Sequence, residues 1–132
     1  MSDPTGNVPS PAGEPRDLHS HPDAAELLDA TIEFLTGVLA PAVPAEHAFH
    51  LRVALNALGM VRRELAFGGA DEAAHRDRLA ALGFADDAEL AVALRAGDVP
   101  DDPRVRAGLL ADAEARLRVA NPRFVADYDE HP

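Results

Sequence analysis

The sequence contains no cysteine, no lysine and no tryptophan. Without cysteine the chain can form no disulfide, no thiolate nucleophile and no cysteine-ligated zinc site. Without lysine it has neither a Schiff-base amine nor the lysine of a phosphate-binding P-loop. These absences exclude several classes of enzyme before any sequence pattern is considered.

Positive charge is also scarce. The 12 basic residues are all arginine, and they stand against 23 acidic residues, so the formal net charge is −11. A nucleic-acid binder needs a basic surface that neutralises phosphates. We therefore expect no nucleic-acid partner.

Long apolar runs are missing as well. No stretch approaches the ~20 apolar residues of a membrane span, so no membrane partner is expected. The first twenty residues lack the basic start and the apolar run of a secretory signal. These observations favour a cytoplasmic protein.

Proline and glycine are concentrated at the beginning of the chain, where apolar residues are few. Such a segment cannot bury enough apolar surface to offset the entropy cost of ordering it. At 132 residues, a single domain is the natural expectation. We expect a disordered tail over 1–21, a helical domain over 22–124 and a frayed acidic tail over 125–132.

The middle of the chain shows a helical period and no sustained alternation typical of strands. Asp23 and Glu26 have the spacing of a capping box, Asp102 precedes a proline at the first helical position, and Gly68-Gly69 is expected to end a helix. The sequence predicts an all-α fold, an irregular antiparallel bundle of about five helices. The expected helices cover 24–39, 46–66, 72–82, 87–96 and 103–120.

The second of these helices is apolar over most of its surface, which is typical of a central helix. The apolar stripes of the other helices should pack against it. The residues expected to be mostly buried are Leu28, Ile32, Leu35, Leu55, Leu58, Leu65, Leu109 and Leu117.

Opposite charges also recur at the i,i+4 spacing, which places them side by side on a helix surface. The expected surface pairs are Glu72 with Arg76, Asp112 with Arg116, and Glu114 with Arg118.

Nucleophiles are few, and the three serines all lie in the expected N-terminal tail. No spacing suggests a nucleophile beside a base and an orienting acid. Gly68-Gly69 is typical of a helix end, not of a phosphate loop. We therefore expect no catalytic residues, no cofactor and no enzymatic activity of its own.

His47 and His50 lie one helical turn apart, next to Glu46. Two histidines at this spacing can share a metal ion, but a site needs a third ligand from another element. The sequence does not indicate that ligand, so no metal site is expected. The alternative function is a small ligand-binding or metal-binding helical bundle, or an enzyme, that uses these histidines and the arginine strip described next.

Arg52, Asn56 and Arg63 form a polar strip on the helix expected to be central, with Phe49 and Met60 at its margins. Arginine pairs well with carboxylate or phosphate groups. The strip either pairs with acidic residues of a neighbouring helix or forms a contact face. The candidate partner-binding residues are Phe49, Arg52, Asn56, Met60 and Arg63.

Three stretches carry a resemblance to a known family. The first is Ala24-Ala25-Glu26-Leu27-Leu28 with the rest of its helix. The second starts at Phe49-His50-Leu51-Arg52 and runs on to Arg63-Glu64-Leu65, and the third is Asn121-Pro122-Arg123-Phe124 with the two residues before it. Over about residues 22–124 the chain resembles a bacterial family of small all-helical proteins catalogued as a domain of unknown function.

Members of that family are typically encoded beside kinases of the aminoglycoside-phosphotransferase type and beside acyl-CoA dehydrogenases. The resemblance therefore implies the small companion of a 4-hydroxyacyl-CoA kinase in acid catabolism. It implies a non-catalytic accessory subunit that binds a phosphotransferase-like kinase chain, and it brings no catalytic residues with it. A homodimer without another partner stays open beside this interpretation.

Overall fold

The computed structural model describes the backbone of residues 21–130 and the side chains of residues 21–127. Residues 1–20 of the tail expected over 1–21 lie outside this range. Within it every regular element is helical, with five α-helices and one π-helical segment, so the all-α prediction is confirmed. The elements are α1 (Ala24–Phe34), η1 (Leu35–Leu39), α2 (Ala45–Leu82), α3 (Asp87–Ala96), α4 (Pro103–Ala120) and α5 (Pro122–Glu130).

Helix α1 begins with the capping box that the sequence predicts. The Asp23 side chain accepts a hydrogen bond of 2.8 Å from the backbone N–H of Glu26, and the Glu26 carboxylate accepts one of 2.9 Å from the N–H of Asp23. These bonds satisfy two backbone donors that a helix start would otherwise leave free. The last turns before Pro41 widen into η1, so the first predicted helix extends as expected to Leu39.

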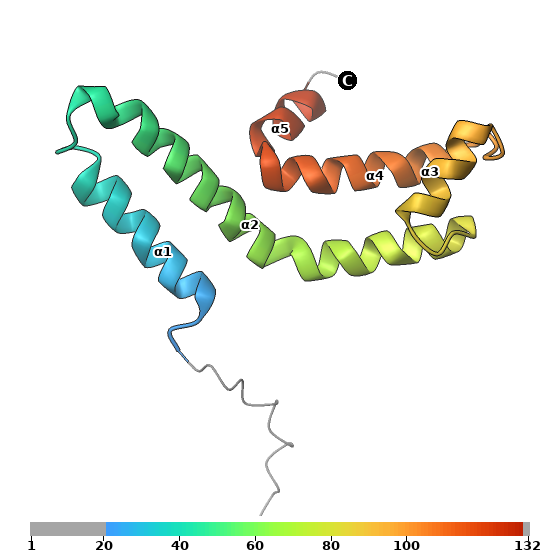
Figure 1. Ribbon diagram of the computed structural model, residues 1–132, viewed down its shortest axis with the longest axis horizontal. Coiled ribbons are helices and arrows are strands. Elements are labelled where there is room, and N and C mark those ends of the chain that lie inside the picture. Colours follow the sequence, from blue (N-terminus) through green and yellow to red (C-terminus); the bar gives the residue numbers. More distant parts are fainter. Residues whose placement is uncertain (1–20, 131–132) are drawn as a thin grey trace, which may run out of the picture.

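Helix α2 is a single element of 38 residues, so the prediction of two separate helices at 46–66 and 72–82 is wrong. Gly68 and Gly69 stay helical in its middle. An interior glycine costs about 1 kcal/mol relative to alanine, and the contacts of both halves of α2 outweigh that cost. Figure 1 shows the helix bending near its middle.

The later helix boundaries follow local capping chemistry. Asp86 and Asp102 cap α3 and α4, and Pro103 takes the first position of α4. Gly83 and Gly97 end α2 and α3 with φ of 88° and 76°, a left-handed conformation that favours glycine. The predicted helices 87–96 and 103–120 are confirmed within a residue.

Helix α5 was not predicted. Asn121 ends α4 as expected, but the chain turns there and Pro122 starts a new helix. Proline fits a first helical position because its missing N–H would have no partner inside the helix. The expectation that the end of the chain frays stays a prediction.

Helix α2 is the axis of the molecule (Figure 1). Helix α1 runs antiparallel along its first half, and α4 runs antiparallel along its second half, with α5 folded back from the end of α4. The result is an open arrangement of two arms that share one long helix. Among the described residues no helix has both the length and the apolar composition to cross a bilayer.

The core is much smaller than predicted. Among the described residues only Leu79, Leu90 and Val105 are buried apolar residues. They lie on the second half of α2, on α3 and on α4, which together form the second arm. Of the eight expected core residues, Leu65 and Leu109 are exposed and the other six are half-buried. The prediction is wrong because each half of α2 is covered on one side only.

Candidate functional site

The predicted strip on α2 is divided by the structure. Arg52 and Asn56 are exposed, whereas Arg63 is half-buried and its Nε donates a hydrogen bond of 2.7 Å to the carbonyl of Val119. The carbonyls at the end of a helix lack intrahelical partners, so this arginine caps the end of α4. Arg63 thus serves the fold, and the other two polar residues remain free to face a partner.

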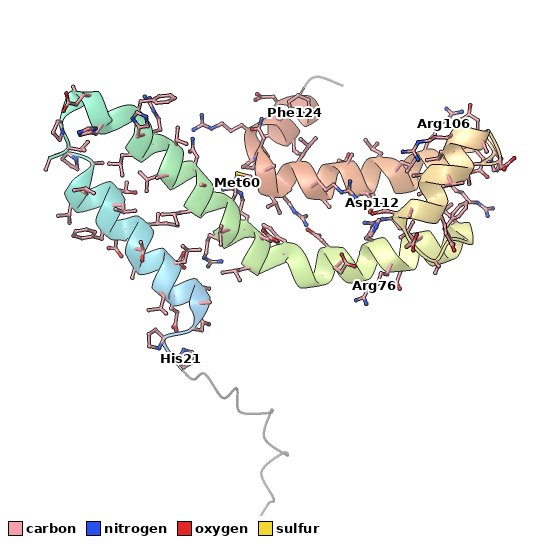
Figure 2. All side chains as sticks on the ribbon, viewed as in Figure 1. His21, Met60, Arg76, Arg106, Asp112 and Phe124 are labelled. Atoms are coloured by element: carbon pink, nitrogen blue, oxygen red, sulfur yellow. The ribbon has the colours of Figure 1, made fainter. Side chains whose placement is uncertain are left out.

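Two apolar side chains accompany the exposed part of the strip. The Phe49 side chain is 62% exposed, and the guanidinium of Arg52 lies 5.9 Å from the centre of its ring. Met60 is 40% exposed on the side of α2 that faces α5 (Figure 2). We call the set Phe49, Arg52, Asn56 and Met60 the partner face.

The histidines near the start of α2 acquire no third ligand among the described residues. His47 Nε2 lies 3.4 Å from the carboxylate of the adjacent Glu46, and the His50 ring packs edge-on against Phe49. Within the described part of the chain, one group of three potential ligands comes together, and it consists of His21, Asp23 and Glu26.

That group belongs to the start of α1 and is exposed. His21 Nδ1 lies 2.8 Å from the Glu26 carboxylate, and this hydrogen bond raises the pKa of His21 and lowers the pKa of Glu26. Glu26 is at the same time part of the capping box. The geometry is explained by helix capping without a metal ion.

The densest polar cluster lies elsewhere, between the second half of α2, the start of α3 and α4. His75 Nδ1 is 2.9 Å from a carboxylate oxygen of Asp112, and His75 Nε2 is 3.3 Å from Asp87. Arg78 donates from Nε and from a terminal nitrogen to the other oxygen of Asp112. We call His75, Arg78, Asp87 and Asp112 the polar clamp.

Asp112 is the centre of the clamp, with 16% of its side chain exposed. Burial alone would raise the pKa of its carboxyl, but the hydrogen bonds from Arg78 and His75 outweigh burial and leave that pKa below its usual value. The carboxylate therefore stays ionised and holds two cation-forming side chains of α2 against α4.

An open cleft of about 390 Å³ borders the clamp. Its lining contains no hydroxyl or thiol side chain, and both ring nitrogens of His75 already face carboxylates. As it stands, the cluster joins three helices. The sequence alone does not indicate this cluster, because His75 and Asp112 are 37 positions apart. The available signal was the pair His75 and Arg78, which share one side of a helix.

The same interface replaces two predicted surface pairs. Asp112 turns to α2 instead of Arg116, and Arg118 reaches Asp71 on α2 at 2.7 Å instead of Glu114. Pairs between helices can form here because α4 lies directly on α2. The third predicted pair, between Glu72 and Arg76, is present at 3.8 Å.

The first arm of the molecule has an unusual surface. Large apolar side chains stay exposed on α1, η1 and the first half of α2, although the apolar stripe of α1 with Leu28 and Ile32 does pack on α2. Monomeric proteins rarely leave contiguous apolar patches of this kind uncovered. We call the following set the hairpin face: Leu27, Phe34, Val38, Val53, Val61 and Leu65.

Comparison with known proteins gives one match. A protein-family model described as a domain of unknown function, DUF6285, matches residues 41–124. No curated protein and no solved structure matches this chain significantly. The match covers α2 to α4 and the start of α5, and it leaves α1 outside. On this evidence the chain belongs to the DUF6285 family, which confirms the resemblance to an uncharacterised family.

Proposed function

We propose that this protein is a cytoplasmic, non-catalytic accessory subunit that binds and supports a phosphotransferase-like kinase chain of the hydroxyacyl-CoA kinase type. The observation that carries the proposal is the mismatch between apolar and buried residues. Fifteen large apolar side chains are exposed, whereas three are buried among the described residues. A chain with so much uncovered apolar surface is suited to association.

The partner face is the best candidate contact for the kinase chain. It combines an exposed aromatic ring, an arginine stacked near it, an amide and a methionine on one side of α2. Aromatic and arginine side chains dominate the energetics of protein interfaces, and methionine adapts to irregular partner surfaces. The four side chains together therefore resemble the centre of an interface.

The charge distribution of the chain would also orient the kinase chain as it approaches. The chain carries a net charge of −11, so its surface repels an acidic partner over most directions of approach. Arg52 is exposed and has no carboxylate partner among the described residues. An acidic patch on the kinase chain would be steered to this side of α2.

The polar clamp supports a binding role in a different way. Its ionisable groups are paired with one another, and the described residues that line its cleft include no hydroxyl or thiol side chain. The clamp fixes the second half of α2 to α4 and thereby gives the partner face a rigid base. The protein would then act by positioning or stabilising its kinase partner.

The test is capture of a phosphotransferase-like chain encoded beside the gene, by co-expression and affinity purification. Arg52→Glu should weaken the complex at least tenfold, because it reverses the charge at the centre of the partner face. Arg76→Glu is the matched control, since Arg76 is exposed on the same helix and pairs only loosely with Glu72. Equal binding by both variants would contradict the proposal.

Activity provides the second readout. The isolated protein should show no phosphoryl transfer, and adding it to the kinase chain should raise that chain's activity or thermal stability. An unchanged kinase, in both respects, would argue against an accessory role. Arg63→Glu should not be used in this test, because Arg63 caps α4 and its loss would disturb the fold.

A further inference from the structure

His75 lies between two carboxylates that belong to different helices. Its Nδ1 is 2.9 Å from a carboxylate oxygen of Asp112, which projects from α4 towards α2 and the start of α3 (Figure 2). Its Nε2 is 3.3 Å from a carboxylate oxygen of Asp87, the first residue of α3. The His75 side chain is 15% exposed, so the ring is largely shielded from water. A single ring on α2 thus connects α3 with α4.

The number of protons on this ring decides how many of the two contacts are favourable. An ionised carboxylate only accepts hydrogen bonds, whereas a neutral imidazole has one N–H and an imidazolium has two. Charged His75 therefore presents an N–H to each carboxylate. Neutral His75 must turn the lone pair of one ring nitrogen towards a carboxylate oxygen, and that contact becomes repulsive.

The geometry identifies the contact that a neutral ring keeps. The contact with Asp112 is the shorter of the two and is a hydrogen bond. Asp112 is 16% exposed, whereas Asp87 is 61% exposed and can turn to water. A shielded carboxylate loses more than an exposed one when its donor leaves. The single N–H of neutral His75 should therefore stay on Nδ1, and the contact between Nε2 and Asp87 is lost.

We propose that His75 is a pH-sensitive link, which ties the start of α3 to α4 when the ring is charged and releases the start of α3 when the ring is neutral. Histidine is the side chain that ordinarily changes its charge between pH 5 and 8. The arrangement with both contacts corresponds to the charged ring. Helices α2 and α4 stay joined in either state, because Arg78 also pairs with Asp112.

The other charged groups around His75 do not replace it as a link to Asp87. On α4, Arg116 lies 3.5 Å from the second oxygen of Asp87, but Arg116 is 73% exposed, and exposed ion pairs contribute little. On α2, Arg78 is engaged with Asp112. The remaining charged residues that line the cleft are the carboxylates Glu64, Asp71 and Glu72, of which the last two pair with Arg118 and Arg76. A neutral His75 thus leaves Asp87 beside a cleft in which carboxylates outnumber arginines.

The release is local, because α3 keeps its other attachments. Leu90, one turn after Asp87, is 5% exposed, and its burial does not depend on the charge of His75. The Asp86 side chain still accepts a hydrogen bond of 2.9 Å from the backbone N–H of Glu89, so the helix itself stays capped. We therefore expect the first turns of α3 to loosen while the rest of the second arm stays folded.

Hydrogen exchange of the α3 amides tests the link directly. Protection factors, which correct for the intrinsic effect of pH on exchange, should fall about threefold or more in α3 between about pH 5.5 and pH 8, and those of α4 should change less. Asp87→Asn should abolish this dependence on pH, because its amide can donate to the unprotonated Nε2. Asp98→Asn, at an exposed position just after α3, is the matched control and should retain it. A wild-type α3 whose protection does not change with pH, or equal behaviour of the two variants, would overturn the proposal.

Nitrogen NMR of the histidine rings gives a second readout. Both ring nitrogens of His75 should carry a proton at about pH 5.5, and at about pH 8 the remaining proton should be on Nδ1. His75→Gln identifies the signals of this ring. His47→Gln should leave the pH dependence of α3 unchanged, because His47 lies on the same helix but near only the adjacent Glu46, at 3.4 Å. A proton on Nε2 at pH 8 would overturn the proposal. Neither experiment involves the kinase chain, so this link and the accessory role can fail separately.

Discussion

Asp112 is the residue on which the second arm depends most. It joins α4 to both His75 and Arg78 of α2, and its carboxylate is mostly shielded from water. Removing one member of such a network leaves its partners without an acceptor in a shielded site, which costs more than a surface substitution.

We expect Asp112→Asn to lower the free energy of unfolding by about 1–3 kcal/mol. The substitution keeps the size of the side chain and removes its charge. Asp77→Asn, at an exposed position of the same interface helix, is the control and should change stability by less than about 0.5 kcal/mol. Urea denaturation at pH 7 measures both, and equal losses would show that the clamp contributes nothing.

The pH dependence of stability should reveal the same group. The folded-state pKa of Asp112 is lowered, so its stabilising effect is present above the unfolded-state pKa of about 3.9 and is lost as the pH falls through the folded-state pKa. The wild-type chain should therefore lose more stability than Asp112→Asn between pH 5 and low pH. Urea titrations at successive pH values would show the two curves converging, and parallel curves would contradict the assignment.

Burial also differs residue by residue. Leu79 is 4% exposed and Leu65 is 51% exposed, although both lie on α2. Leu79→Ala should cost roughly 2–4 kcal/mol, and Leu65→Ala should cost clearly less. Thermal unfolding of the two variants measures both losses of stability. Equal costs would mean that the first arm is covered within one chain after all.

At the scale of elements, the glycine pair in α2 is the main surprise. A Cβ at Gly69 would meet no atom within 4 Å, and a Cβ at Gly68 would make only an ordinary contact with Glu64. Neither glycine is required by close packing within the chain. The two glycines therefore lower the stability of the helix, although no neighbouring atom requires a residue without a side chain at either position.

Gly68→Ala and Gly69→Ala should each raise the free energy of unfolding by about 0.5–1 kcal/mol. Gly83→Ala should have the opposite sign, because Gly83 ends α2 with a φ of 88° that alanine adopts poorly. Differential scanning calorimetry of the three variants provides the comparison. A loss of stability at position 69 would reveal a role for the bend that the packing does not show.

The boundaries of most helices could be predicted because capping chemistry is local. Asp23, Asp86 and Asp102 act within three residues of themselves, and the sequence contains everything they need. The continuation through Gly68-Gly69 could not be predicted from neighbours alone. It depends on contacts with α1 and α4, which are distant in sequence.

At the scale of the whole molecule, an apolar stripe on a helix shows which side avoids water but not what covers it. On α1, Leu28 and Ile32 are covered by α2 as expected, whereas the apolar residues Leu27 and Phe34 beside them stay exposed. The polar clamp was missed for the same reason, since its members meet only when α4 lies on α2. The partner face was predicted as a strip that included Arg63. In the structure Arg63 instead donates a hydrogen bond to the carbonyl of Val119 at the end of α4.

Protection against amide exchange should be graded along the molecule. Local stability follows buried contacts, so the amides around Leu79, Leu90 and Val105 should exchange most slowly. Those of α1, which has no buried residue, should exchange faster. Hydrogen-exchange mass spectrometry measures this gradient, and uniform protection would indicate one cooperative unit instead of two arms.

The order of the two arms along the chain matters during synthesis. The contacts of α1 lie with the first half of α2, as in the pair between Asp29 and Arg62, so they can form before α4 exists. At about 5–20 residues per second, the stretch from Leu65 to Asp112 takes roughly 2–10 s to translate. During that interval the first arm can form with its apolar side exposed, whereas Asp112, the hydrogen-bond partner of His75, has not yet been synthesised. The apolar residues of the first arm are therefore exposed to the surroundings of the ribosome for seconds before the second arm can fold.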